Sequence, residues 1–150
     1  MLDSGWTMRP DQIQLEVVTP ERAVLAEEVD AVVLPGTNGE LGVLPGHVPL
    51  LTRLDIGEMV VHSSGEQRRF FIVRGFAEIL GDQVRVLAQE CEGVEEIDVE
   101  KARAELEEAE QEVQKLEERR DEDEEDMLER YRDSLRKNRQ RLMMSGEMDE

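Results

Sequence analysis

The N-terminal part of the chain alternates short apolar or β-branched runs with turn-forming residues. The runs cover residues 13–18, 29–34, 56–61, 70–73, 76–80 and 84–88. In the first run Ile13, Leu15 and Val17 alternate with polar or exposed positions, which places one face against a core and the other in water. No helical segment that could link parallel strands lies between the runs. The pattern therefore predicts an antiparallel β-sandwich or small barrel over residues 11–93.

The C-terminal part follows a helical period and contains no glycine or proline from Val94 to Ser145. The first apolar seam consists of Val99, Ala102, Leu106, Ala109, Val113 and Leu116, preceded by Asp98 as the expected N-cap. A second seam, out of register with the first, consists of Leu128, Tyr131, Leu135 and Leu142. Six consecutive acids at residues 121–126 separate the seams, and they disfavour a continuous helix while favouring the start of a new one. The pattern predicts a helical hairpin over residues 97–144, with one long helix joining a coiled coil as the alternative.

Both seams are narrow, and two of the six positions in the first seam are alanine. Little apolar area would therefore hold the helices together, and helical stability comes mostly from such packing. A weakly held hairpin can detach, as a conformational switch requires. With residues 1–10 as an N-terminal extension and 145–150 as a flexible tail, the expected fold class is α+β, an N-terminal antiparallel β-sandwich followed by a C-terminal α-helical hairpin.

Charge and composition narrow the possible partners. The 150 residues include 37 acidic and 18 basic side chains, for a net charge of -19, and only 3% are aromatic. Such a chain repels phosphate backbones and offers few stacking surfaces, so nucleic acid is not an expected partner. No apolar run is long enough to span a membrane, and the first residues do not resemble a signal peptide. The lone Cys91 fits a reducing compartment and excludes an internal disulfide or a cysteine-based zinc module.

Candidate catalytic chemistry is sparse. His47 and His62 lack ligand partners at metal-binding spacing, and neither has a context that would activate Cys91 as a nucleophile. The phosphate-binding pattern GxxxxGK[ST] does not occur. We therefore expect no catalytic residue, no bound metal and no enzyme activity of the chain alone. Two alternatives are a β-domain and coiled-coil adaptor, and a small metal-dependent hydrolase that uses Glu40 and His47.

The densest turn signals lie in residues 34–51, which read LPGTNGELGVLPGHVPLL. Four glycines and three prolines within residues 35–50 predict a rigid, shaped connection. Glu40 and His47 project from this connection, and polar groups on rigid loops commonly meet a partner. The structural alternative is a pair of sandwich turns without a binding role.

This segment resembles the LPGxxGELGVLPGHxPLL pattern of the epsilon subunit of F-type ATP synthases. The resemblance continues in order over residues 11–110, through QLEVVTPE, VRGFAEI and VRVLA, with Arg74 in place of a common glycine. It implies a noncatalytic central-stalk subunit of a complex that couples proton transport to ATP synthesis. The sandwich would bind the gamma subunit and the c ring, and the hairpin would extend into the alpha/beta catalytic head to block ATP hydrolysis. The chain would lie at the cytoplasmic face of the bacterial inner membrane, held there by its partners.

The resemblance also implies partner-binding residues. Glu40, Gly42 and His47 match family positions at the edge that faces the c ring. The second helix carries six cations within twelve residues: Arg130, Arg132, Arg136, Lys137, Arg139 and Arg141. Among these we expect Arg132, Arg136 and Arg139 to dock on an acidic surface of the beta subunits. The alternative is that the cations only complement the dipole of the helix near its C-terminus.

Some bacterial members of the family bind ATP on the folded hairpin, through an I[DE]xxRA-type motif and basic residues of the second helix. The candidates that match by spacing are Glu92, Asp98, Lys101, Lys137 and Arg141. Lys101 stands where the motif has arginine, and an ammonium cannot form the paired hydrogen bonds of a guanidinium. The acidic run adds an electrostatic cost for a polyphosphate. We therefore expect ATP binding to be absent or no tighter than millimolar, and no other cofactor.

Overall fold

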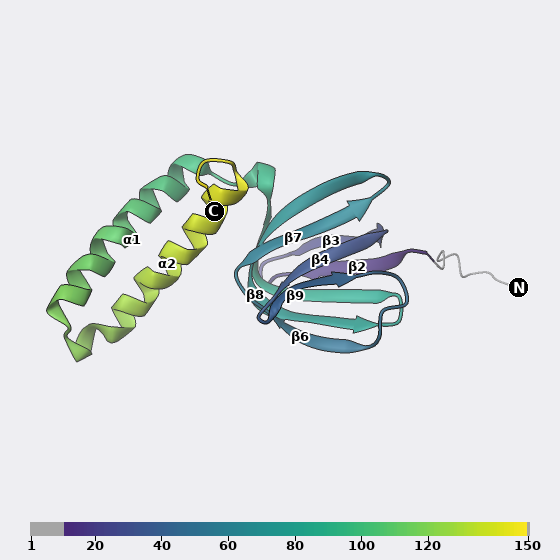
Figure 1. Ribbon diagram of the computed structural model, residues 1–150, viewed down its shortest axis with the longest axis horizontal. Helices are drawn as coiled ribbons and strands as arrows, with labels where there is room; N and C mark the ends of the chain where they lie inside the picture. The colour runs from purple at the N-terminus through teal and green to yellow at the C-terminus, as the bar shows by residue number, and fades with distance from the viewer. Residues whose placement is uncertain (1–10, 150) are drawn as a thin grey trace, which may run out of the picture. The chain divides into compact units, whose positions relative to one another are not determined.

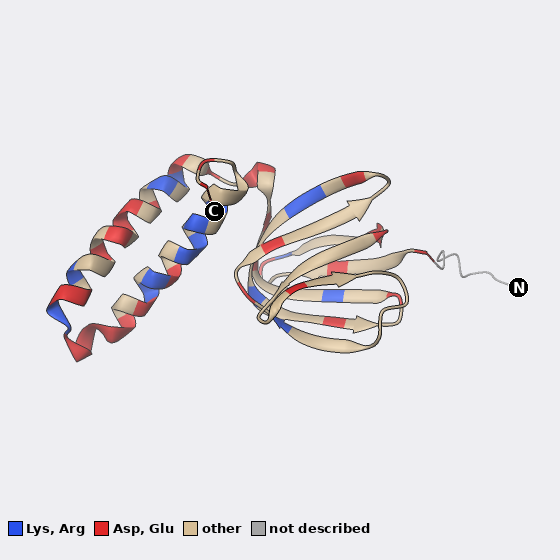
Figure 2. Cartoon of the chain, in the orientation of Figure 1, with Lys and Arg blue, Asp and Glu red and all other residues tan. Residues whose placement is uncertain are grey.

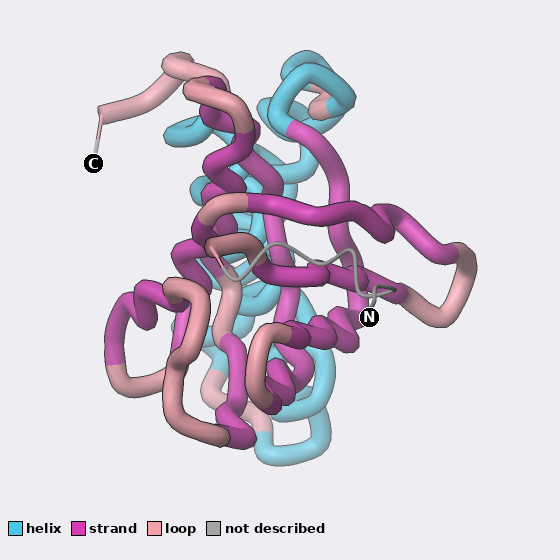
Figure 3. The backbone as a smooth tube through the Cα atoms, turned by 90° about the vertical axis from the view of Figure 1, so that its right-hand side faces the viewer, coloured by secondary structure: helices cyan, strands magenta, loops and turns pink. Residues whose placement is uncertain are grey.

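The computed structural model describes residues 11–149, so the extension expected over residues 1–10 lies outside the described residues. The chain divides into two compact units at the boundary between Gly93 and Val94. Strands make up the first unit and helices make up most of the second (Figure 1, Figure 3). The predicted β-sandwich followed by a helical hairpin is confirmed.

The first unit contains eight strands within the described residues. Their bounds are β2 Ile13–Val18, β3 Ala23–Val29, β4 Ala31–Gly36, β5 Gly39–Val43, β6 Leu50–Leu54, β7 Gly57–Ser63, β8 Glu66–Leu80 and β9 Gln83–Gly93. They hydrogen-bond in the order β3-β2-β9-β8-β6-β4-β5, and β7 pairs with both β4 and β8. Alternate residues of these strands point inward, so the sheet folds over a single apolar core.

One pair of strands departs from the antiparallel prediction. β2 and β9 run parallel, with Leu15 opposite Val84 and Val17 opposite Val86, whereas the other pairs among the described strands are antiparallel. Parallel neighbours need a long connection. Here the intervening strands of the sandwich provide that connection, so no crossover helix is required.

The two strands predicted at residues 70–73 and 76–80 are one long strand, β8. β7 pairs with its first half and β6 with its second half. Gly75, which lies between the two predicted runs, is inside β8 with φ +142°. A Cβ atom at this position would lie 1.8 Å from the carbonyl oxygen of Leu87 on β9. Glycine is therefore required for the close approach of two strands and does not mark the end of one.

Three strands were not predicted from the sequence: β3 and β5, which lie at the two ends of the sheet order, and β6, which lies between β8 and β4. β3 contains Glu27 and Glu28, and Val29 is its one fully buried residue. β5 lies within the glycine-rich segment and pairs with β4 across a two-residue turn at Thr37 and Asn38. An edge strand can be largely polar because only one of its faces needs to be apolar. Apart from that two-residue turn, residues 44–49 are the part of the predicted connection that remains a loop.

The sandwich core is built from side chains of its own strands. Its buried members include Ile13, Leu15, Val17, Val29, Val32, Leu34, Val43, Leu54, Met59, Val61, Phe70, Ile72, Ile79, Val84 and Val86. Cys91, the lone cysteine, is buried in the same cluster. No residue of this cluster comes from beyond Gly93. The first unit therefore has a hydrophobic core of its own, as an independently folding domain requires.

The second unit is an antiparallel pair of helices (Figure 1). Helix α1 spans Val99–Arg119, helix α2 spans Glu125–Met144, and the short 3-10 helix η2, Glu122–Glu124, lies between them. The backbone N–H of Lys101 donates to Oδ1 of Asp98 at 3.1 Å, so Asp98 is the N-cap, as predicted. The chain forms the hairpin and not the alternative single long helix.

The apolar seam of the hairpin is as narrow as predicted. Ala102, Leu106 and Leu142 form its buried cluster, with Val99 and Leu135 partly buried against them. Three further seam residues, Ala109, Leu116 and Leu128, are also buried. Burying alanine removes little apolar area from water, so this seam contributes less stability than a leucine-rich one.

The hairpin turn begins at a strained residue. Arg120 has φ +48° and ψ +46°, in the left-handed region, and its N–H donates to the carbonyl oxygen of Leu116 at 3.0 Å. Relative to glycine, this conformation costs other residues about 1 kcal/mol. We expect Arg120→Gly to stabilise the folded hairpin by about 1 kcal/mol, measured as slower amide hydrogen exchange in α1 and α2. Arg130→Gly, inside α2, should have the opposite effect. Faster exchange in Arg120→Gly would contradict the expectation.

Candidate functional site

The glycine-rich segment places two of its candidate residues on the edge strand β5. Glu40 and Gly42 are exposed and share one face of the strand, because Leu41 and Val43 take the inward positions. β5 is the last strand of the sheet order and pairs with β4. No atom lies within 4 Å of the place that a Cβ would occupy at Gly42. This face of β5 is therefore an open surface that presents one carboxylate.

The third candidate, His47, lies in the loop of residues 44–49. The N–H of Gly46 donates to Oδ1 of Asp82 at 3.1 Å, which ties the loop to the turn between β8 and β9. The N–H of His47 donates to the carbonyl oxygen of Leu44 at 3.2 Å. Nδ1 of the His47 ring lies 2.7 Å from the carbonyl oxygen of Val48, which can only accept, so Nδ1 is the donor. These bonds fix the position of the loop and the orientation of the imidazole.

The alternative of a metal-dependent hydrolase requires a cluster of metal ligands. Within residues 11–149 there is no group of three or more His, Cys, Asp or Glu side chains that could hold a metal ion. His62 is on β7, opposite Ala31 of β4 and Gln67 of β8. Among the same residues, no helix is long and apolar enough to cross a membrane.

The sandwich carries exposed apolar side chains that the alternating pattern does not predict. Leu44, Val48, Leu51 and Leu80 are 64%, 69%, 67% and 60% exposed. A sequence signal for some of them exists: Leu50 and Leu51 are adjacent strand residues, so one of the two must face outward. Exposed apolar residues that gather on a surface commonly mark an interaction site.

Two further exposed apolar residues are cross-strand neighbours. Phe76 of β8 lies opposite Leu87 of β9, and both are about half exposed. The guanidinium carbon of Arg53 on β6 lies 5.9 Å from the centroid of the Phe76 ring. Leu87 follows the inward residues Val84 and Val86 at the outward phase of β9, so it is an apolar residue where alternation predicts a polar one. Leu51 is two residues from Arg53 on β6, and Arg53 is the residue opposite Phe76, so Leu51 is on the same side of the sheet. We call Leu51, Phe76 and Leu87 the apolar face of the sandwich.

The two helices of the hairpin carry opposite charge. α1 has eight acidic and four basic residues, and α2 has four acidic and six basic residues (Figure 2). Arg132 of α2 donates to Oε1 of Glu129 at 2.9 Å and to Oε1 of Glu117 on α1 at 3.4 Å. The hydrogen bond to Glu129, followed by the bond to Glu117, raises the pKa of Arg132 above its usual value. In the folded hairpin Arg132 therefore joins α2 to α1.

The other predicted docking arginines lie on the same side of α2. Arg136 and Arg139 follow Arg132 at intervals of four and three residues, and all three are exposed. We call Arg132, Arg136 and Arg139 the basic stripe. The structure thus brings the three predicted arginines together on one helix face.

The acidic run also contacts α1: Oε2 of Glu124 accepts a hydrogen bond from Arg119 at 2.6 Å.

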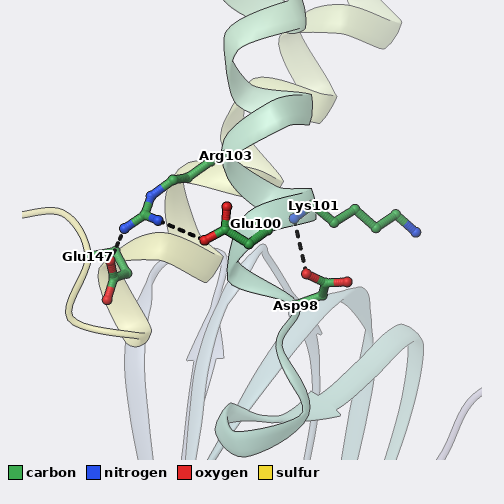
Figure 4. A network of polar contacts seen from close by, with 5 residues as sticks. All are labelled: Asp98, Glu100, Lys101, Arg103 and Glu147. Atoms are coloured by element: carbon green, nitrogen blue, oxygen red, sulfur yellow. Dashed lines mark hydrogen bonds and ion pairs between the residues drawn. The ribbon is translucent and has the colours of Figure 1, made fainter.

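The residues proposed to bind ATP have other contacts in this structure. The carboxylate of Asp98 caps α1, and the side chain of Lys101 is exposed and extends away from that carboxylate (Figure 4). Arg103 lies on a different side of α1 and pairs with Glu100 at 3.2 Å and with Glu147. Lys101 and Arg103 are thus separated around the helix, as their spacing predicts.

The remaining ATP candidates lie on a strand and on the second helix. Glu92 is half-buried on β9, opposite Phe71. Nζ of Lys137 lies 3.7 Å from Oδ2 of Asp133, and Nη1 of Arg141 donates to Oδ1 of Asn138 at 3.0 Å. Weak or absent ATP binding stays a prediction.

Comparisons with known proteins agree on one family. The family described as ATP synthase, Delta/Epsilon chain, beta-sandwich domain matches residues 12–94. The ATP synthase epsilon chain of Solibacter usitatus is 48% identical over 97 residues, which cover 65% of this chain and 72% of the relative. The ATP synthase epsilon chain of Carboxydothermus hydrogenoformans is 51% identical over 96 residues, 64% of this chain and 72% of the relative.

A solved structure is similar over almost the whole chain. It is a chain in the cryo-EM structure of Euglena gracilis mitochondrial ATP synthase, comprising OSCP, F1 and the c-ring in rotational state 1. The TM-score is 0.67 at 27% sequence identity, with 98% of this chain and 86% of the other covered. Sequence and structural similarity therefore lead to the same complex.

Proposed function

Because the chain belongs to the delta/epsilon chain family of ATP synthases, we propose that it is the noncatalytic epsilon subunit of a proton-transporting ATP synthase. The observation that carries this proposal is the family match over residues 12–94, which contain the sandwich and its glycine-rich segment. In this proposal the sandwich holds the chain in the central stalk. The helical hairpin regulates the complex and is not needed for attachment.

The sandwich offers two surfaces for two partners. The apolar face, Leu51, Phe76 and Leu87, suits the gamma subunit, because burying exposed apolar side chains is the main favourable contribution to a stable interface. The c ring binds at the face of β5 that presents Glu40 and Gly42, together with the loop that carries His47. The hydrogen bond from Gly46 to Asp82 supports this role, since a loop that transmits torque must be held in one place.

The hairpin acts as a brake on ATP hydrolysis. Its seam contains alanine at two of the three buried α1 positions nearest the N-terminus, Ala102 and Ala109, so opening loses little buried area. Opening also breaks the contact between Arg132 and Glu117. The basic stripe is then available to an acidic surface of the alpha/beta head. In the closed hairpin the six cations of α2 lie on a helix that pairs with the acidic helix α1. After opening, α2 can bind another acidic surface in place of α1.

The location of the chain follows from its partners. The c ring lies in the membrane, and the sandwich binds it from the cytoplasmic side of a bacterial inner membrane. Attachment is peripheral and depends on protein contacts. Hydrolysis and synthesis of ATP take place on the catalytic head, and this chain contributes no catalytic residue.

Glu40→Lys is expected to weaken coupling to the c ring about tenfold, because reversing a charge at a complementary interface replaces attraction with repulsion. The free energy of unfolding of the isolated chain should change by less than about 0.5 kcal/mol, since Glu40 is exposed. Proton pumping per ATP hydrolysed in reconstituted vesicles and urea unfolding measure the two effects.

Glu66→Lys is the matched control, because it reverses an exposed carboxylate at the start of β8. It should leave pumping unchanged. If Glu40→Lys unfolds the sandwich or pumps as well as Glu66→Lys does, β5 is only part of a turn and not a binding surface.

A further inference from the structure

The seam of the hairpin contains one buried polar residue. Asn138 is 1% exposed and lies on α2 between Leu135 and Leu142, at intervals of three and four residues. These intervals continue the second apolar seam, which has leucine on both sides of this position. Burying an amide in a seam is unfavourable unless its hydrogen bonds are all made.

The hydrogen bonds of Asn138 are made, mostly within its own helix. Nδ2 donates to the carbonyl oxygen and to Oγ of Ser134, at 2.9 and 3.2 Å. Oδ1 accepts from Nη1 of Arg141 at 3.0 Å. One bond crosses the hairpin, from Nδ2 to Oε2 of Glu105 on α1 at 3.2 Å. The local bonds can persist in a detached helix, whereas the bond to Glu105 exists only in the closed hairpin.

This arrangement can specify the register of α2 against α1 without adding much stability to the closed hairpin. The bond to Glu105 fixes which turn of α2 lies against which turn of α1, because a slip by one turn would leave a buried amide without its interhelical partner. A polar residue in an apolar seam commonly specifies register while it lowers stability. Opening returns the amide to water at little loss, since water replaces the one bond that breaks.

We propose that Asn138 and Glu105 form a polar latch that sets the register of the closed hairpin and keeps it easy to open. Asn138 is the destabilising member of the latch, because an apolar side chain of similar size at this position would bury more apolar area. Glu105 is the stabilising member, because it supplies the acceptor across the hairpin. Apolar substitution of the two residues therefore changes opening in opposite directions. The consequence for ATP hydrolysis, but not the latch itself, depends on the proposed function.

Amide hydrogen exchange of the full-length chain tests the latch without any partner. In Asn138→Leu, we expect the opening equilibrium of α1 and α2 to fall about tenfold or more, seen as slower exchange. In Glu105→Ala, we expect opening to rise about threefold, which lies at the weak end of the range for one lost hydrogen bond because water replaces the bond when the hairpin opens. Exchange in the β-sandwich should be unchanged in both variants.

Two variants control for general effects on helices. Gln140→Leu adds the same side chain outside the seam, and Glu108→Ala removes an exposed carboxylate from α1 close to Glu105. Neither should reproduce the change seen at the matching latch residue. Faster exchange in Asn138→Leu, or latch variants that match these controls, would overturn the proposal.

The assembled synthase then reports on the regulatory role. Slower exchange in Asn138→Leu together with less inhibition of ATP hydrolysis supports both the latch and the brake. Slower exchange with unchanged hydrolysis supports the latch and contradicts the brake, so the two failures are distinguishable.

Discussion

Ending the chain at Glu96 is expected to raise ATP hydrolysis by the assembled synthase about tenfold, which lies within the usual range for regulatory coupling of 1–3 kcal/mol. The truncation removes both helices, and with them the basic stripe that binds the catalytic head in our proposal. The sandwich should remain folded and attached, because its core cluster contains only residues up to Cys91. Steady-state hydrolysis of the purified complex, normalised to the amount of bound chain, measures the effect.

A chain ending at Met144 is the control for this truncation. It keeps both α1 and α2 and removes only the residues after the helices. We expect it to inhibit hydrolysis as the full chain does. Equal hydrolysis with the full chain and with the chain ending at Glu96 would contradict the brake while leaving attachment through the sandwich intact.

Gly75→Ala is expected to destabilise the sandwich by about 4 kcal/mol or more, which is a large part of the total stability of a typical domain. The added Cβ would lie 1.8 Å from the carbonyl oxygen of Leu87 and 2.9 Å from Cα of Ala88. Both are backbone atoms of β9, so the clash cannot be relieved by turning a side chain. The positive φ adds a second penalty for a residue other than glycine.

Urea unfolding of the full chain, monitored by strand signals, tests this expectation. Gly42→Ala is the matched control, because no atom lies within 4 Å of the corresponding Cβ position. It should change the free energy of unfolding by less than about 1 kcal/mol. A comparably small change in Gly75→Ala would show that β8 and β9 do not approach as closely as described.

The sequence predicts a strand well where one face is apolar and the other polar. Residues 13–18 coincide with β2 because Ile13, Leu15 and Val17 are buried and alternate with less buried residues. β3 and β5 escape the same reasoning, because an edge strand can form with few buried residues once a neighbour supplies the hydrogen bonds. β6 escapes it because Leu54 is its one buried residue, so the strand shows no alternating apolar run. The sequence predicts two strands where β8 is one, because Gly75 resembles a turn residue. The contact that requires glycine there comes from Leu87 and Ala88 of β9, and the residues next to Gly75 in the sequence do not reveal it.

The helices are predicted better than the site. Intervals of three and four residues locate both seams, and Asp98 is recognised as a cap from its position alone. Asn138 fits the interval of the second seam, but a polar residue at that position interrupts the apolar pattern and is not predicted to be buried. Its burial is explained by its hydrogen bond to Glu105, which only the structure shows. The apolar face was missed for a related reason. Whether Leu51 or Leu50 points outward depends on how the sheet closes, which local alternation does not decide.

Affinity purification of the tagged chain tests its place in the central stalk most directly. The full-length chain and the chain ending at Glu96 are expressed separately and purified with a mild detergent, and their partners are identified by mass spectrometry. We predict that the gamma subunit and the c ring accompany both chains in similar amounts. Presence of these subunits only when the helices are attached would contradict attachment through the sandwich. Their absence from both preparations would contradict the place in the central stalk and favour an adaptor unrelated to ATP synthase.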